Sequence, residues 1–401
     1  MGILDGIKVL ELGSYIMAPA TCAILGEMGA EVIKIEEPGG GDPSRGLSIG
    51  PVQISPLFML ENRNKKSFAV DMTTEDGQKI VHQMIETADV LVTNMSEEVL
   101  ARLGMQYATL SQINPRLIFA SASAYGPKGP EAKRRNFDVS AFWTRGGFMS
   151  YLGEPDSAPP AQAAGAFGDH TASVHLALGV ISALYHRERT GEGQRVNVSL
   201  LGTGIWTAAV PVQIALLLGF SLPRAGRKGA LNPLYNNYKS RDGMWFMLAL
   251  LQSDRHWPDL CCAVDREDLI DDPRFLSQDK RMENAGELVS TLDAIFSTKT
   301  MEEWAECFEK NNILFWDQAR DYAEIATDPQ ALANDYIVDV KRDDSGENPV
   351  KLVAFPVQFT KSKGGIKSAA PELGQHTEEL LLEIGYSWED ITDLKDREVI
   401  L

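Results

Sequence analysis

Cysteine is scarce in this chain, and its few copies are not arranged for chemistry. Only four cysteines occur among 401 residues, at positions 22, 261, 262 and 307, and none forms a C-x-x-C pair. This usage argues against a disulfide-stabilised secreted fold and a cysteine-based zinc site. Adjacent Cys261 and Cys262 are better explained as small apolar residues than as a redox pair. The pattern is typical of a reduced, cytoplasmic protein.

Positive charge is also in short supply. The chain has 38 Lys and Arg against 56 Asp and Glu, a formal net charge of −18. Nucleic acid and anionic membranes both need a basic face, so we expect neither as the main partner. The longest apolar candidate, residues 205–222, is interrupted by Pro211 and Gln213, and it is too short to span a bilayer. The N-terminus lacks the pattern of a signal peptide.

Motifs of several large enzyme classes are missing. The sequence contains no G-x-S-x-G, no phosphate-binding G-x-x-x-x-G-K-[ST] and no H-E-x-x-H. The six histidines form no ligand set, so we expect no metal. Residues 13–19 follow the first expected strand without a G-x-G-x-x-G fingerprint, so a nicotinamide cofactor is not expected. We expect no permanently bound cofactor.

What is present is an alternation of apolar strands and helices. We expect strands at the following residues: 8–12, 30–36, 67–70, 90–93, 117–122 and 195–201. Helices are expected between them, at residues 19–28, 74–87 and 171–185. Strand–helix–strand order with short links predicts an α/β fold with a Rossmann-like open parallel sheet.

A change in composition near residue 224 predicts a second domain. Residues 225–327 have the pattern of a smaller α+β unit, with a strand at 244–250 and helices at 257–262, 285–296 and 301–310. The large domain is then discontinuous and consists of residues 1–224 and 328–401.

Basic residues gather near the expected strands despite the negative net charge. They are Lys65, Lys66, Arg102, Lys128, Lys133, Arg134 and Arg135. Ligands of open α/β sheets bind at the carboxyl ends of the strands, so an anionic ligand is plausible. For any single one of these residues, a solvated surface position is the simpler interpretation.

Residues 163–170, Ala-Ala-Gly-Ala-Phe-Gly-Asp-His, contain the acidic residue of most interest, Asp169. Small residues precede it, and a long apolar helix follows. One interpretation is a helix N-cap, the commoner role of aspartate in this position. The other is a carboxylate nucleophile that attacks an acyl carbonyl. Asp138 likewise suits either a buried, paired acid or a cap.

Taken together, these segments resemble the class III CoA-transferases. The matching segments are residues 6–12, 29–36, 41–46, 64–67, 89–94, 125–126, 168–169, 190–194 and 374–377. The resemblance runs almost end to end, and it implies that Asp169, beside Gly168, is the catalytic aspartate. It also implies two domains, an interlocked homodimer, and coenzyme A as a thioester substrate rather than a cofactor.

The resemblance further implies where CoA binds. The implied contacts are Ile16, Val70, Asn94, Met95, Arg102, Tyr125, Arg135 and Phe137. Ile16 stands in the turn where formyl-CoA transferase has an active-site glutamine, so oxalate and formate are not expected substrates. Residues 238–251 look more like the branch of the family that acts on aryl-lactates, cinnamates and branched 2-hydroxy acids.

The implied mechanism is covalent. Asp169 attacks the donor thioester to give a mixed anhydride, the CoA thiolate returns to form an aspartyl-CoA thioester, and an acceptor acid reverses these steps. Two alternatives remain open. The α-methylacyl-CoA racemases share the fold, but they use a proton-transferring histidine where this chain has Phe137. A non-catalytic acyl-CoA binding protein is the other.

Overall fold

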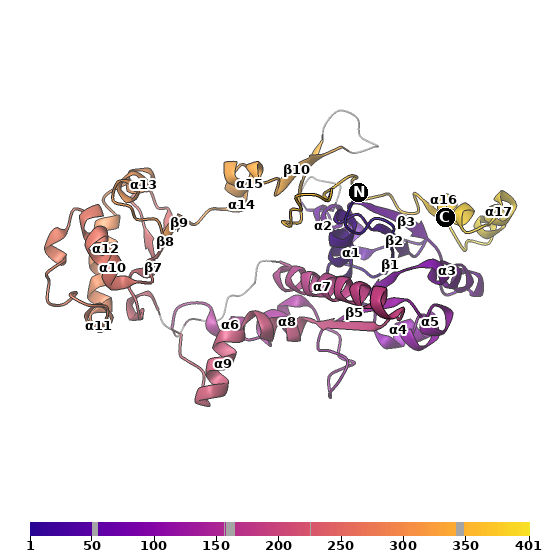
Figure 1. Ribbon diagram of the computed structural model, residues 1–401, viewed down its shortest axis with the longest axis horizontal. Helices are drawn as coiled ribbons and strands as arrows, with labels where there is room; N and C mark the ends of the chain where they lie inside the picture. The colour runs from indigo at the N-terminus through magenta and orange to yellow at the C-terminus, as the bar shows by residue number, and fades with distance from the viewer. Residues whose placement is uncertain (50–54, 156, 158–164, 225, 342–348) are drawn as a thin grey trace. The chain divides into compact units, whose positions relative to one another are not determined.

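The computed structural model describes residues 1–49, 55–155, 157, 165–224, 226–341 and 349–401 (Figure 1). The chain divides into two compact units. The first comprises Met1–Phe148, Gln162–Gln213 and Pro329–Leu401, and the second comprises Met149–Ala161 and Ile214–Asp328. Both ends of the chain therefore belong to the first unit.

A six-stranded sheet forms the centre of the first unit. Its strands are β1 Lys8–Leu12, β2 Glu31–Glu36, β3 Lys65–Ala69, β4 Val90–Thr93, β5 Ile118–Ser123 and β6 Arg195–Ser199. They are ordered β3-β2-β1-β4-β5-β6, and every neighbouring pair is parallel. The predicted Rossmann-like parallel sheet is confirmed. The strand order reverses between β1 and β4, and such a reversal opens a crevice at the carboxyl ends of those two strands.

Helices cover both faces of this sheet (Figure 1). Helices α1 (Met17–Glu27) and α7 (Phe167–Thr190) lie side by side on one face, over alternate strand residues such as Val9 and Val32. The other face packs against α3 Glu75–Thr87, α5 Tyr107–Ile113, α16 Thr377–Glu383 and α17 Trp388–Asp396. This two-sided burial explains why the central strands β4 and β5 consist mostly of apolar and small residues.

Strand β6 is shorter than expected because its last residue begins a helix. The Ser199 side chain accepts a hydrogen bond from the Gly202 amide and so caps α8 (Leu200–Thr207), which α9 (Ala209–Leu218) follows. Within the described residues, no single helix has the length and apolar character to cross a bilayer. Helices α8 and α9 together are long and apolar enough, but they are bent by 77° where they meet.

Four fully buried charges join strands β1, β2 and β3. Lys34 Nζ lies 2.6 Å from Glu11 Oε1 and 2.8 Å from Asp42 Oδ2, and Lys65 Nζ lies 2.6 Å from Glu11 Oε2. The expectation that Lys65 is near the carboxyl end of a strand is wrong. It is the first residue of β3, and its ammonium group is committed to this buried network.

The second unit is built on a small antiparallel sheet. Strands β7 Tyr235–Lys239, β8 Trp245–Ala249 and β9 Trp316–Gln318 are covered by α10 Ser253–Ala263, α11 Gln278–Glu283, α12 Ala285–Phe296 and α13 Met301–Lys310. Its core combines aliphatic and aromatic side chains, with Phe246, Phe296 and Phe308 in mutual contact. Helices α12 and α13 have the predicted bounds.

The remaining elements are short. They are η1 Pro43–Gly46, α2 Pro56–Glu61, α4 Glu97–Arg102, η2 Val139–Thr144, α6 Phe148–Tyr151, η3 Arg227–Gly229, η4 Glu267–Leu269, α14 Tyr322–Ile325, α15 Pro329–Ala333, β10 Ile337–Val340 and β11 Val350–Val353. Strands β10 and β11 pair antiparallel to each other.

Candidate active site

The loops after β1 and β4 are fastened together at the crevice of the sheet. The Asn94 side chain accepts a hydrogen bond from the Ser14 amide at 3.1 Å and donates one to the Ser14 carbonyl at 2.8 Å. The next residue, Tyr15, has a positive φ of 64°, and its amide donates to buried Asp42. These bonds fix the position of Ile16 at the start of α1.

Asp169 is the third residue of α7. The N-cap position belongs to Ala166, whose backbone is left-handed, and the helix has no side-chain cap. The capping interpretation of Asp169 is therefore wrong. Its carboxylate is half-buried and accepts no hydrogen bond within the described part of the chain. The small residues Ala163 and Ala164, which precede this turn, lie outside the described residues.

Asp138 is a second acid in this region, and it is almost completely buried. It is 5% exposed, and neither carboxylate oxygen makes a hydrogen bond of ordinary geometry. The predicted burial of Asp138 is confirmed. Asp138 also occupies the N-cap position of η2, but its side chain makes no capping hydrogen bond there. A Cβ atom on Gly168 would lie 2.0 Å from Asp138 Oδ1, so only glycine lets this carboxylate approach the start of α7.

Glu61 and His170 form a hydrogen-bonded pair beside the two aspartates. His170 follows Asp169 on α7, and its Nε2 lies 2.8 Å from Oε1 of Glu61, the last residue of α2. The Glu61 side chain is 1% exposed, whereas that of His170 is 44% exposed. Three carboxylates and one imidazole therefore meet at the N-terminus of α7.

The crowding of acids shifts the pKa values of this cluster. Burial, together with the charges of Asp138 and Glu61, raises the pKa of Asp169 from 3.8 to about 7, although the nearby His170 opposes the rise. Burial also raises the pKa of Asp138, against the Trp143 indole and the amide groups of Gly168 and Ala166. The hydrogen bond with Glu61 raises the pKa of His170.

Aromatic rings line the segment between Asp138 and Asp169. Phe142 and Phe148 stack with centroids 4.8 Å apart, and Trp143 packs edge-on against Phe148. Trp143 also contacts the ring of Phe167, the first residue of α7. These rings form one aromatic cluster beside Asp138 and the start of α7.

Several of the predicted CoA contacts are brought together at the crevice. Arg135 donates a hydrogen bond to Ser96, directly after Met95 in the β4 loop, at 2.8 Å. The exposed ring of Phe137 meets Tyr15 edge-on in the β1 loop, with centroids 6.4 Å apart. The loops after β1, β4 and β5 thus converge with the segment around residue 136.

The other predicted contacts are more scattered. Tyr125 follows β5, and its hydroxyl accepts a hydrogen bond from Asn136 at 2.6 Å. Arg102 is exposed at the end of α4. Val70 differs from the rest because its side chain is 1% exposed in the core, beyond β3 and two strands away from β1.

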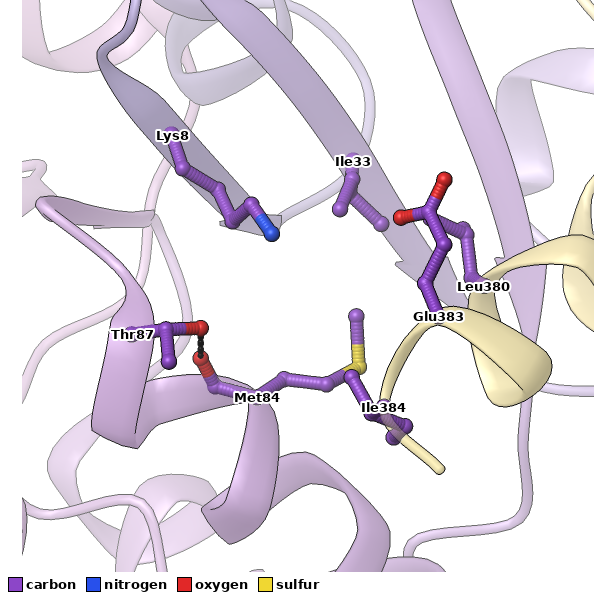
Figure 2. Close-up of a pocket in the computed structure, with 7 residues that line it drawn as sticks. All are labelled: Lys8, Ile33, Met84, Thr87, Leu380, Glu383 and Ile384. Atoms are coloured by element: carbon purple, nitrogen blue, oxygen red, sulfur yellow. Dashed lines mark hydrogen bonds between the residues drawn. The ribbon is translucent and has the colours of Figure 1, made fainter. Parts of the chain in front are cut away.

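A separate pocket lies at the opposite end of the sheet. It is small and is lined by Lys8, Ile33, Met84, Thr87, Leu380, Glu383 and Ile384 (Figure 2). Lys8 is the first residue of β1, so this pocket belongs to the amino ends of the strands. Neither aspartate of the α7 cluster lines it.

Sequence analysis missed Glu61 and gave His170 no role. Glu61 is distant in sequence from Asp169, and no local pattern indicates that α2 reaches α7. The one available signal was the Asp-His pair itself, which places two titratable groups on a single helical turn. Among the described residues, no group of His, Cys, Asp and Glu side chains could hold a metal ion.

Comparison with known proteins gives concordant results. Residues 4–377 match CoA-transferase family III. The chain is 36% identical to the (R)-2-hydroxy-4-methylpentanoate CoA-transferase of Clostridioides difficile, over 99% of each chain. It is 34% identical to the cinnamoyl-CoA:phenyllactate CoA-transferase of Clostridium sporogenes, covering 100% of this chain and 98% of the relative.

A solved structure also shares the fold. The CAIB/BAIF family protein from Brucella suis superimposes with a TM-score of 0.85 at 28% identity. The match covers 95% of this chain and 99% of that protein.

Proposed function

This chain belongs to CoA-transferase family III, and on that premise we propose that it moves CoA between carboxylic acids through an aspartyl-CoA thioester on Asp169. The observation that carries the proposal is the state of Asp169. Its carboxylate sits half-buried at the start of a helix and accepts no hydrogen bond from the described residues. Its lone pairs are therefore available for attack on an acyl carbonyl.

The steps balance with this one residue as nucleophile. An Asp169 carboxylate oxygen bonds to the thioester carbonyl carbon, and the carbon–sulfur bond breaks to release CoA thiolate. The thiolate attacks the aspartyl carbonyl of the mixed anhydride and expels the donor acid as its carboxylate. The acceptor carboxylate then attacks the aspartyl thioester, and the same steps run in reverse.

Each tetrahedral intermediate needs donors for its oxyanion. The amides of Phe167 and Asp169 have no partner within α7, because they lie in the first helical turn, whereas the Gly168 amide faces the Asp138 carboxylate. Gly146 is a poorer candidate, since its amide already donates to the Phe142 carbonyl at 3.0 Å. We therefore assign the oxyanion donors to the start of α7.

We propose branched or aromatic 2-hydroxy and aryl acids as the substrates. The aromatic lining around Phe142 and Trp143 supports this assignment. Two relatives also support it, because they are named for 2-hydroxy-4-methylpentanoate and for cinnamoyl-CoA and phenyllactate. CoA is then a substrate in transit, and the loops after β1, β4 and β5 are its proposed binding site.

A panel of acyl-CoA donors and free acids tests this substrate class. Branched or aromatic 2-hydroxy acids should accept CoA with a kcat/KM at least about tenfold above that for succinate or formate, because an apolar pocket discriminates by buried methylene groups. Chromatographic quantification of each CoA ester gives the ranking. A preference for succinate or formate would contradict the assignment.

Racemisation at C2 is the second candidate activity, since the racemases share this fold. Phe137 disfavours it because a phenyl ring cannot transfer a proton, and its ring is 71% exposed. A 2-methylacyl-CoA incubated with the protein in D₂O should retain its C2 hydrogen. Rapid deuterium incorporation, observed by mass spectrometry, would instead favour the racemase. An acyl-CoA binding protein would give neither transfer nor exchange.

We propose a homodimer, interlocked as in the resembling family, with the two units as its large and small domains. Helix α9 supports it, because this helix is strongly apolar and no residue of it is buried within the chain. A stripe of exposed apolar residues on α7, formed by Val174, Leu178 and Tyr185, supports it as well. Four free cysteines support a reducing cytoplasmic location.

Substitution within α9 tests the dimer. Leu217 is 75% exposed in the single chain, so Leu217→Glu should leave the monomer fold intact but place a charge in the interface. We expect light scattering to report half the wild-type mass. Leu276→Glu, at an exposed leucine of the second unit, is the matched control and should stay dimeric. Equal masses for wild type and Leu217→Glu would refute this interface.

A further inference from the structure

We propose that the Glu61–His170 pair is a positioning device for the nucleophile, placing an imidazolium beside Asp169 that holds it as a carboxylate against Asp138. The inference rests on the proposed function, in which Asp169 attacks as the anion. His170 contacts no reacting atom in this account. It is therefore a positioning residue, not a catalytic one.

Two helices fix the geometry of this pair. Helix α2 begins at Pro56, with the Ser55 hydroxyl accepting from the Phe58 amide at 3.1 Å, and it ends on the buried carboxylate of Glu61. On α7, the His170 amide donates to the Ala166 carbonyl at 2.8 Å and closes the first helical turn. Glu61 holds the imidazole of His170 by a hydrogen bond, and the charge of that imidazole acts on Asp169 without any bond between Glu61 and Asp169.

The charges that face Asp169 come from three elements. Asp138 approaches from the residue before η2, Glu61 from the end of α2, and His170 from α7 itself. Two of the three are acids, and the groups besides His170 that face the Asp138 carboxylate, the Trp143 indole and two backbone amides, are neutral. His170 is the positive group in this set.

Arginine does not replace the imidazolium. Arg63 is close enough to lower the pKa of His170, but its guanidinium pairs with Glu27 at 2.5 Å. Glu27 in turn accepts from the Phe355 amide at 3.0 Å, so this ion pair is part of a different contact. The ionisation of Asp169 therefore depends on whether His170 is charged.

The charges of His170 and Asp138 should shift the pKa of Asp169 in opposite directions. A pKa of about 7 leaves roughly half of Asp169 ionised at pH 7, and only the ionised form attacks. Removing the positive charge of His170 should raise the pKa of Asp169 further. Removing the negative charge of Asp138 should lower it. A structural defect alone would predict neither shift.

The test is the pH dependence of kcat/KM in the full-length enzyme. In His170→Gln, the acid limb should move to higher pH by about one unit, because an opposite charge at close range shifts a carboxyl pKa by about that much or more. At pH 7 this is a loss of roughly fivefold, and most of the rate should return at high pH. In Asp138→Asn, the limb should move to lower pH.

His175 provides the matched control on the same helix. Its Nδ1 bonds to the Thr171 carbonyl at 2.7 Å, and it contacts none of the acids of the cluster. His175→Gln should keep the wild-type acid limb. If His170→Gln fails to fold, the downward shift in Asp138→Asn carries the test alone.

Two results would overturn the inference. One is a rate loss in His170→Gln that is equal at every pH, with the acid limb unmoved. The other is a shift of Asp138→Asn in the upward direction. Failure of the proposed function is distinguishable from both, because it would leave the wild-type enzyme without a CoA adduct on Asp169, whatever the pH profile.

Discussion

Asp169→Asn should abolish CoA transfer and leave the fold intact. Asparagine keeps the size and hydrogen-bonding shape of the side chain, but its amide oxygen is not a nucleophile. Loss of a covalent nucleophile costs about 10³-fold or more in kcat, because no other group of the site replaces its attack. Initial-rate assays with the preferred donor and acceptor measure the loss. Transfer within tenfold of wild type would disprove the assignment.

Although Asp169→Asn should lose activity, we expect it to be more stable than wild type at neutral pH. The pKa of Asp169 is raised from 3.8 to about 7, so ionising this group in the folded protein is unfavourable, and wild-type stability is lost as pH rises between those values. Asp169→Asn should match wild type near pH 4 and exceed it above pH 7 by about 2 kcal/mol after allowance for solvent screening.

Urea unfolding at both pH values measures this difference. Glu188→Gln, at an exposed position near the other end of α7, is the control and should be neutral at both. A variant less stable than wild type at pH 8 would show that the carboxylate is favourably solvated in the folded chain.

Lys34→Met should destabilise the first unit by about 3–5 kcal/mol, because removal of one partner leaves buried charges unpaired. Lys34 is fully buried and bridges Glu11 and Asp42. Burial works against ionisation of Asp42, but the charge of Lys34 and the hydrogen bonds of Ser44 leave its pKa lowered overall. The loss should therefore narrow as the pH falls below about 4 and the Asp42 carboxylate takes up a proton.

The neighbouring strand offers a matched control. Lys66 pairs with Glu31, Glu379 and Glu383, but its side chain is 27% exposed and its partners are more exposed still. Lys66→Met should cost no more than about 1 kcal/mol, as surface ion pairs do. Equal losses of unfolding free energy in Lys34→Met and Lys66→Met would show that the buried network contributes no more to stability than a surface ion pair.

Activity in Lys34→Met should fall as well. Asp42 accepts the Tyr15 amide, and Lys34 donates to the Gly13 carbonyl at 3.1 Å. Without Lys34 the β1 loop loses its bond at Gly13, and Asp42, which holds Tyr15, loses its ion-pair partner at the proposed CoA site. We expect KM for the acyl-CoA to rise more than kcat falls, because the proposed role of the loop is to bind CoA and not to take part in the chemistry.

The sheet was predictable from sequence because its signals are local. Central strands such as β4 and β5 are short apolar runs bounded by turn residues, and the connecting helices have their own period and stop. Helices α12 and α13 were predicted to the residue, since both have clear ends. Asp169 could be placed at a helix start for the same reason.

The electrostatics of the site could not be predicted in this way. Glu61 reaches His170 across 109 residues, and Asp138 reaches Gly168 only because glycine lacks a Cβ. Lys65 looked like a surface cation until the register of β3 placed it beside Glu11. Contacts of this kind depend on how helices and strands pack against one another. Composition and periodicity do not predict that packing.

The central claim is that CoA becomes covalently attached to Asp169. Intact-mass spectrometry after rapid quenching with an acyl-CoA, followed by peptide mapping, tests it most directly. We predict an increase equal to CoA as a thioester on the peptide that contains Asp169, and its absence in Asp169→Asn. An enzyme that transfers CoA at full rate without this adduct, or that carries the adduct on another residue, would contradict the account.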